Sequence, residues 1–285
     1  MQKLKSASGE NKSGFTLIEL SLSLVFIGIL SLAVAYVISD TIGSYRRGLT
    51  LSQINMTGID LVDDMRKTIQ DSPVKSPVEE LCSKLKKNSN KCKDDGAEKF
   101  INISVEDEIT VKGNNKLTVP IYGAFCTGKY SYVWNSGYLF ASGSNVGKAI
   151  FYKGDEEIKD FRLLRVEDAS RAVCASVVNE NYEVIKNKKE FRIEDGDAEV
   201  IDLLSFSESD GGLALYDLNV PVPARDKMNS SALYSVSFIL GTVQGGINIK
   251  KSGGFCATPG EYEDENFDYC AINKFNFAVL ATGGL

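Results

Sequence analysis

The chain has 285 residues, a net charge of −6 and no histidine. Without histidine it has no Ser-His-Asp or Cys-His catalytic machinery and no histidine-ligated zinc or haem. Its 43% hydrophobic and 25% charged residues are typical of a folded chain, and the acidic balance disfavours a nucleic-acid-binding body.

A long apolar segment lies near the amino terminus. Residues 15–38, FTLIELSLSLVFIGILSLAVAYVI, carry a single charge, on Glu19. A helix of about 24 residues spans roughly 36 Å, which exceeds the roughly 30 Å hydrocarbon core of a bilayer. The preceding residues 1–14 carry three lysines against one glutamate. We therefore predict a single membrane crossing that keeps residues 1–14 in the cytoplasm and exports the rest of the chain.

The junction between these segments reads SGFTLIE over residues 13–19. A polar leader ends in Gly14, an apolar helix begins with Phe15, and the carboxylate of Glu19 follows four residues later. This pattern resembles the class III signal of type IV prepilins and pseudopilins. The resemblance implies cleavage after Gly14 by a membrane-embedded aspartic prepilin peptidase, and N-methylation of Phe15. It also implies that Glu19 pairs with the Phe15 amine of its own or a neighbouring subunit.

Glu19 also has a simpler interpretation. A carboxylate within a membrane segment costs about 2.5–3.5 kcal/mol on insertion scales and usually marks a functional position. A carboxylate near the start of a helix also stabilises the positive end of the helix dipole without any other function. The neighbouring Gly14-Phe15 junction favours the functional interpretation.

Helical periodicity continues beyond the apolar segment. Apolar residues recur at steps of three and four from Ile42 to Ile69, and Pro73 then ends the pattern. We predict one helix over residues 15–70, with a membrane-spanning half over 15–38 and an amphipathic half after it. This is the arrangement of the pilin helix.

Strand signals dominate residues 71–285, the exported head. The fold class expected is therefore α+β, a long N-terminal helix with antiparallel sheets. The pilin resemblance adds that one sheet packs on the second half of the helix, and the length of the head suggests a large minor pilin. The predicted strands are 100–105, 108–112, 116–122, 130–134, 138–141, 149–152, 161–166, 172–178, 200–206, 213–220, 233–240, 246–250 and 275–281, with a hairpin turn at 135–137.

All six cysteines lie in the exported part of the chain. An even number in an oxidising compartment favours disulfides, although about fifteen pairings are possible for six cysteines. Proximity in the sequence suggests Cys82–Cys92, Cys126–Cys174 and Cys256–Cys270. A redox or thiolate metal site is the weaker alternative because the chain contains no C-x-x-C motif.

Three other groups of residues are candidate sites. The carboxylates between residues 256 and 270 suit either a solvated loop or Ca²⁺ binding, and a loop is the commoner case. The aromatic residues of 122–138 suit strand packing better than ligand stacking. Arg162, Arg165 and Arg171, with the lysines of 186–189, are the local candidates for a nucleic-acid patch. We therefore expect no enzyme activity, metal, cofactor or small-molecule substrate, and the acidic balance of the chain disfavours a nucleic-acid partner.

The resemblance implies a structural subunit of a type IV pilus, most simply a minor pilin. Its partners are then other pilin subunits through the N-terminal helix, the prepilin peptidase, the pilus assembly platform and, before assembly, the cytoplasmic membrane. After processing the protein would lie in a cell-surface pilus. Two alternatives stay open: a pilus-tip binding module, either an adhesin or a DNA-capture minor pilin, and a minor pseudopilin of a type II secretion system. DNA capture requires a basic patch and strong salt dependence.

Overall fold

A computed structural model gives the fold of the chain. The chain divides into two compact units, residues 1–46 and 47–285. The residues that the structure describes are 16–71, 101–110, 116–127, 129–141, 147–177, 185, 188–204, 212–221, 224–226, 231–243, 256 and 270–281.

Helix α1 (Leu17–Gln70) confirms the single long helix expected from the periodicity. Its apolar side chains are exposed along the first unit. In the second unit α1 buries one face, as the spacing of its apolar residues predicts. The residues buried on that face are Ile54, Gly58, Leu61, Met65, Thr68 and Ile69.

The largest sheet of the head has five antiparallel strands in the order β1-β2-β3-β6-β8. Two strands predicted at 100–105 and 108–112 form the single strand β1, with an irregularity in its pairing between Val105 and Glu106. The strands are β1 (Ile101–Thr110), β2 (Lys116–Cys126), β3 (Tyr130–Asn135), β6 (Leu163–Glu167) and β8 (Val200–Asp202).

Two smaller sheets complete the described part of the head. In one, β11 (Ser231–Thr242) pairs antiparallel with β9 (Leu213–Asn219), β10 (Ala224–Asp226) and β12 (Ile272–Ala281). The other has the order β5-β4-β7, with β4 (Ile150–Lys153), β5 (Glu156–Ile158) and β7 (Glu190–Ile193). Strands β4 and β7 pair parallel, which differs from the antiparallel expectation. The long connection between them permits a crossover that a tight turn would not.

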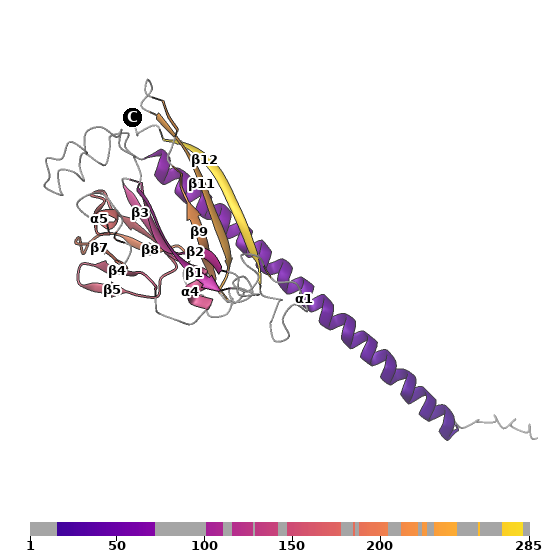
Figure 1. Ribbon diagram of the computed structural model, residues 1–285. Helices are drawn as coiled ribbons and strands as arrows, with labels where there is room; N and C mark the ends of the chain where they lie inside the picture. Colours follow the sequence, from indigo (N-terminus) through magenta and orange to yellow (C-terminus); the bar gives the residue numbers. More distant parts are fainter. Residues whose placement is uncertain are drawn as a thin grey trace, which may run out of the picture. The chain divides into compact units, whose positions relative to one another are not determined.

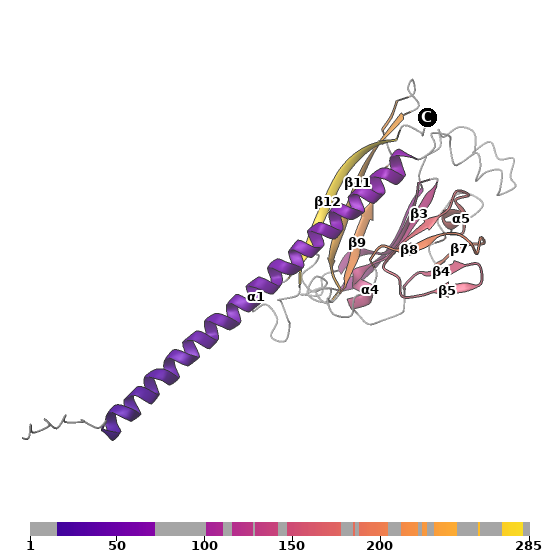
Figure 2. The same ribbon diagram turned by 180° about the vertical axis from the view of Figure 1, so that it is seen from behind.

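The five-stranded sheet separates two apolar cores, because alternate side chains of a strand point to opposite faces. On one face Phe125, Tyr132 and Trp134 share a core with α1 and with the sheet around β11. On the other face Tyr122 and Val133 pack with helix α5 (Ala172–Ala175) and the β5-β4-β7 sheet. Within the second unit, Figures 1 and 2 show α1 beside β9, β11 and β12, with α5, β4, β5 and β7 on the far side of the five-stranded sheet.

The strand predicted at 138–141 is wrong, because residues Gly137–Ala141 form helix α4. The hairpin predicted at 135–137 is also wrong. The Asn135 amide donates to the carbonyl oxygens of Ala149 and Phe161, both at 3.2 Å, so β3 ends there. A Cβ on Gly137 would collide with the ring of Tyr216, and only glycine allows the chain to turn so close to that ring.

The strand predicted at 172–178 is wrong in the same way, since Ala172–Ala175 form α5. The Asp168 carboxylate accepts hydrogen bonds from the backbone N–H of Ala172 at 2.8 Å and of Val173 at 3.1 Å. These bonds satisfy donors that a short helix leaves without partners at its start. Burial raises the pKa of Asp168, and the hydrogen bonds that its carboxylate accepts partly offset that rise.

Because of Tyr138 on α4, we expect the stability of the head to fall at alkaline pH. Burial, with a smaller contribution from the charge of Asp217, raises the pKa of Tyr138 to about 12. In the unfolded chain the pKa of a tyrosine is about 10. The neutral Tyr138 hydroxyl therefore contributes fully to the stability of the head below that pH, and this contribution is lost as the pH rises toward the pKa of Tyr138 in the folded chain. Between about pH 9 and about pH 11, we expect the free energy of unfolding to fall by about 1 kcal/mol more in the parent chain than in Tyr138→Phe. Denaturant titrations at both pH values test this, and equal losses in the two chains would contradict it.

Candidate functional site

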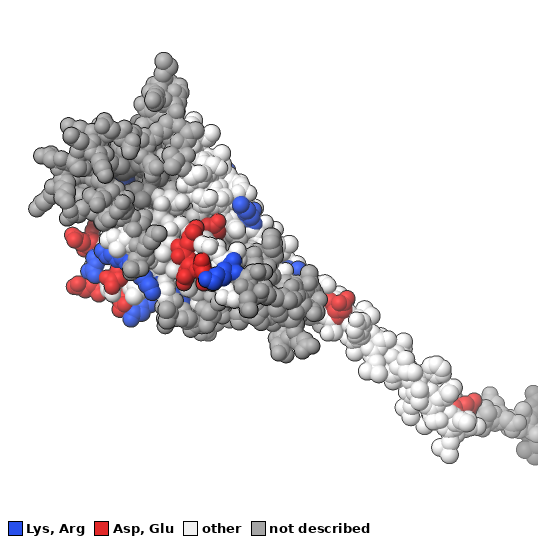
Figure 3. All heavy atoms as spheres, in the orientation of Figure 1, with Lys and Arg blue, Asp and Glu red and all other residues white. Residues whose placement is uncertain are grey.

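The exposed part of α1 is the most unusual surface in the described chain. Between residues 17 and 38 the exposed fraction of each large apolar side chain lies between 50% at Val34 and 89% at Leu17. Figure 3 shows this part of the helix almost without charge, whereas positive and negative groups are interspersed on the described surface of the head. Soluble monomers rarely expose a contiguous apolar surface of this size. The helix is long and apolar enough to cross a membrane.

Three hydroxyl side chains of α1, on Ser21, Ser23 and Thr41, donate hydrogen bonds to the backbone of their own helix. Ser21 donates to the Ile18 carbonyl at 2.9 Å, and Ser23 donates to the Glu19 carbonyl at 2.8 Å. Thr41 donates to Val37 at 2.7 Å. These three hydroxyls are therefore satisfied by their own helix, which reduces the cost of placing them in lipid or against another apolar helix.

Glu19 and Thr16 form a reciprocal cap at the start of α1. The backbone N–H and the hydroxyl of Thr16 each donate to Glu19 Oε2 at 3.0 Å, and the Glu19 N–H lies 3.3 Å from Thr16 Oγ1. This is the geometry of a capping box, which the T-x-x-E spacing could have signalled. Gly14 and Phe15 lie outside the described residues, so the expected pairing of Glu19 with the Phe15 amine stays a prediction.

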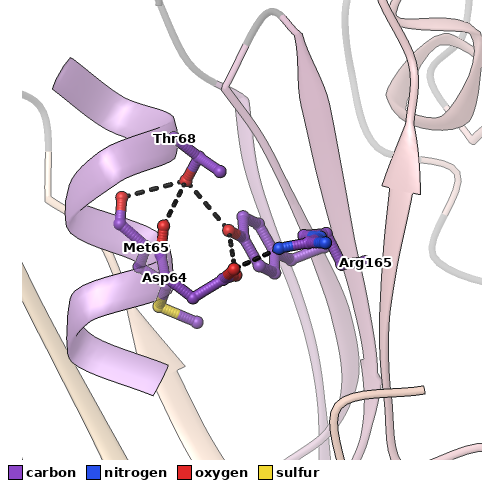
Figure 4. Close-up of polar contacts among 5 residues, drawn as sticks. Asp64, Met65, Thr68 and Arg165 are labelled. Carbon is purple, nitrogen blue, oxygen red and sulfur yellow. Dashed lines mark hydrogen bonds and ion pairs between the residues drawn. The ribbon is translucent and has the colours of Figure 1, made fainter. Parts of the chain in front are cut away.

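A polar cluster joins the second-unit part of α1 to the five-stranded sheet (Figure 4). Its members are Asp64 and Thr68 on α1, Tyr132 on β3 and Arg165 on β6, called here the Asp64 cluster. Arg165 Nη1 donates to Asp64 Oδ1, and the Tyr132 hydroxyl donates to Asp64 Oδ2 at 2.8 Å. The Thr68 hydroxyl lies 2.9 Å from the Tyr132 hydroxyl. The cluster thus connects one turn of the helix to two neighbouring strands.

The electrostatics of the cluster keep Tyr132 neutral. Burial, and then the negative charge of Asp64, raise the pKa of the Tyr132 hydroxyl well above its usual range. The Arg165 guanidinium lies 5.3 Å from the centre of the Tyr130 ring, a cation–π contact that adds to its ion pair. The sequence does not predict this cluster, because nothing near Asp64 in the sequence indicates partners 68 and 101 residues away.

A second contact region fixes α1 against β12. A Cβ on Gly58 would collide with the ring of Phe275, so the glycine makes room for that ring. Phe275 in turn stacks on Phe238 of β11 with ring centres 5.0 Å apart. Nearby, Asn273 Nδ2 donates to Asn55 Oδ1 at 2.7 Å. Helix propensity disfavours glycine here, so Gly58 serves the packing rather than the helix.

The structure joins two of the three suggested cysteine pairs. Cys126 at the end of β2 is bonded to Cys174 on α5, with their Cα atoms 6.3 Å apart. Cys256 is bonded to Cys270 just before β12, with a Cα separation of 5.8 Å. Both separations lie in the usual range for disulfides. Cys82 and Cys92 lie outside the described residues.

The other candidate residues are distributed through the core instead of gathering at a site. Arg162 and Arg171 are each only 4% exposed, and Arg165 belongs to the Asp64 cluster. These three arginines therefore do not form an exposed basic patch. Tyr132 and Trp134 are fully buried, as expected for strand packing. The acidic loop between Cys256 and Cys270 lies outside the described residues.

The comparisons with known proteins add no relative: no family model, curated protein or solved structure matches the chain. Within the described residues, no group of three or more metal-ligating side chains lies together. What the described chain offers is an uncovered apolar helix in one unit, and in the other a head held on the continuation of that helix by the Asp64 cluster and Gly58.

Proposed function

We propose that this protein is a structural subunit of a type IV pilus, a minor pilin that is cleaved after Gly14 and N-methylated at Phe15. The observation that carries the proposal is helix α1. It is uncovered and apolar over its first half, and its second half is built into a folded head. The Gly14-Phe15 junction with Glu19 stands directly before that uncovered half.

The proposal accounts for the uncovered apolar surface in two successive environments. Before assembly, residues 17–38 lie in the cytoplasmic membrane, where apolar side chains have no contact with water. In a filament the same side chains are covered by helices of neighbouring subunits. Exposing apolar surface to water costs about 25 cal/mol of free energy per Å². A subunit that passes directly from lipid into a filament avoids this cost, because its apolar helix is covered in both environments.

Glu19 acquires a new partner when the leader is removed. In the intact chain its carboxylate is held by Thr16, and the nitrogen of Phe15 is part of a peptide bond. Cleavage after Gly14 turns that nitrogen into an amine, which is positively charged below its pKa of about 8. This cation forms close to Glu19 in sequence, and in a filament the amine of a neighbouring subunit is an equivalent partner.

A substitution at the cleavage junction tests the proposal. We expect Gly14→Val to lower the processed fraction at least about tenfold, because a branched side chain next to the scissile bond prevents close approach of the peptidase. Ser13→Val is the matched control, one residue further from the bond, and is expected to be processed normally. The measurement is mass spectrometry of the N-terminal peptide from native cells, on membranes and on sheared surface filaments separately.

The two fractions distinguish the outcomes. N-methyl-Phe15 enriched in sheared filaments supports a pilus subunit, and the same terminus retained in the cell envelope supports a secretion pseudopilin. A chain that begins at Met1 and is confined to membranes would refute both. Normal processing of Gly14→Val would remove Gly14 from the proposed recognition site.

A further inference from the structure

The turn between β7 and β8 contains an aspartate that is directly followed by a glycine. Asp195 and Gly196 lie between Ile193, the last residue of β7, and Val200, the first residue of β8 (Figure 1). Both residues are exposed. Because glycine has no Cβ, other groups can approach its backbone nitrogen more closely than that of any other residue. The turn therefore places a carboxyl group next to an uncrowded backbone nitrogen.

The carboxyl group of Asp195 is folded over the backbone of Gly196. Its Oδ1 accepts a hydrogen bond from the backbone N–H of Asp197 at 3.0 Å, which closes an Asx turn. The Asp195 carbonyl oxygen also accepts a hydrogen bond from the Ala198 N–H at 3.3 Å. The main chain and the side chain of Asp195 thus both bend toward the residues that follow, and Cγ is held beside the Gly196 peptide.

The Gly196 nitrogen is open to reaction. Within the described residues it donates no hydrogen bond. The φ of Gly196 is not positive, and a Cβ built on Gly196 would meet no atom within 4 Å. Neither the backbone conformation nor the available space therefore requires glycine at position 196. What the glycine provides is free access to its nitrogen.

We propose that Asp195–Gly196 is a self-modification site at which the backbone rearranges to isoaspartate. The Gly196 nitrogen forms a bond to Asp195 Cγ and loses its proton. One carboxylate oxygen leaves as water, with that proton and another from the solvent, and a cyclic imide remains. Water then adds to the main-chain carbonyl carbon of Asp195 and breaks its bond to the nitrogen. Water is the only co-reactant, nothing is oxidised or reduced, and the step is independent of the proposed function.

The rearrangement changes the turn that connects two sheets. The main chain now runs through Cβ and Cγ of Asp195 and is longer by a carbon atom, and the former carbonyl becomes a free carboxylate. In the unmodified turn that carbonyl holds the N–H of Ala198, a residue only 6% exposed that packs in the core beside the β5-β4-β7 sheet. We therefore expect isoaspartate to loosen the backbone at Ala198.

The same turn contains a control carboxyl group. Asp197 is exposed, as Asp195 is. The nitrogen that follows Asp197 belongs to Ala198, which has a Cβ and already donates a hydrogen bond. Because that nitrogen is both engaged and crowded, we expect no rearrangement at Asp197.

Incubation in heavy-oxygen water measures the reaction at both aspartates. The full-length chain in detergent is incubated near neutral pH and then digested in ordinary water. The peptide that contains residues 194–199 is analysed by mass spectrometry with fragmentation that separates aspartate from isoaspartate. Each passage through the imide introduces an oxygen atom from the solvent, so we expect label and isoaspartate at position 195 and neither at position 197.

Two variants make the measurement specific to the proposed reaction. We expect Gly196→Ala to lower labelling at position 195 at least about tenfold, because its Cβ crowds the nitrogen while pointing into open space. Asp195→Glu keeps the charge but can close only a larger ring, and should also remain unlabelled. An unlabelled Asp195 in the parent chain, or equal labelling of the parent and Gly196→Ala, would overturn the proposal.

Hydrogen exchange tests the structural consequence. After incubation we expect the Ala198 amide to exchange faster in the parent chain than in Gly196→Ala, whereas the two chains should exchange alike before incubation. Equal exchange in an incubated parent sample that contains isoaspartate would overturn the expected loosening of the turn.

Discussion

Replacing Arg165 by methionine is expected to destabilise the head by about 3 kcal/mol, because it removes one partner of a largely desolvated ion pair. The side chains of Arg165 and Asp64 are only 22% and 21% exposed. Without the guanidinium, the Asp64 carboxylate keeps the hydrogen bond from Tyr132 but loses its counter-charge. The measurement is denaturant unfolding of the full-length chain in detergent, followed by the fluorescence of Trp134, the only tryptophan, which is fully buried in the same core.

Two further variants make this prediction specific. Lys116→Met removes an ion pair with Glu108 whose side chains are 71% and 58% exposed, and is expected to cost less than about 0.5 kcal/mol. The double variant Asp64→Leu with Arg165→Met leaves no unpaired charge and should recover most of the stability lost by the single one. A double variant as unstable as Arg165→Met alone would show that the loss came from packing and not from the stranded carboxylate.

We infer from its contacts that the Asp64 cluster helps to fix the helix on the five-stranded sheet. Ile54 and Leu61 are similar side chains seven positions apart on the buried face of α1, so these two alone discriminate weakly between registers of the helix. The space that Gly58 leaves for the Phe275 ring and the Asp64 cluster favour a single register. A buried polar group with particular partners excludes such alternatives, which is its best-attested contribution in helical assemblies. A fixed register in turn determines which side of α1 is left for a partner.

Helix α1 and most strands could be predicted from the sequence, because the order of apolar and polar residues within each segment determines them. The buried face of α1 follows from a periodicity of three and four, which is also the geometry of the helix. Its apolar first half follows from the uninterrupted apolar run over residues 15–38. Most strands followed from β-branched and aromatic runs. The two helices assigned as strands, α4 and α5, depend on tertiary contacts of Tyr216 with Gly137 and on the carboxylate of Asp168, and such contacts override local propensity.

One part of the candidate site could be predicted from the sequence and another part could not. The exposed apolar helix was predictable because its composition alone sets its length and polarity. The partners of Asp64 were not, since Tyr132 and Arg165 reach it only after β2, β3 and β6 have paired. Arg165 illustrates the difficulty, because in the sequence it was a candidate for a basic patch and in the structure it is the counter-charge of a helix residue.

Of the two described disulfides, the one between Cys126 and Cys174 should contribute more to the stability of the head. It joins residues 48 positions apart, and closing a loop of that length in the unfolded chain is worth about 4 kcal/mol in the chain-entropy model. The second bridge spans 14 positions and is worth about 3 kcal/mol on the same basis. Cys126 and Cys174 are also fully buried, so their removal leaves a cavity that adds to the loss.

We therefore expect the paired substitution Cys126→Ala with Cys174→Ala to lower the free energy of unfolding by at least about 4 kcal/mol, against about 3 kcal/mol for Cys256→Ala with Cys270→Ala. A reductant supplies an independent order, because Cys256 is partly exposed while both sulfurs of the first bridge are enclosed between β2 and α5. Mild reduction should release Cys256 and Cys270 first, as alkylation and peptide mapping would record. If the enclosed bridge opened first, or if its removal cost less than that of the shorter one, then α5 would be held on β2 by the Asp168 cap and its apolar contacts instead of by the bond.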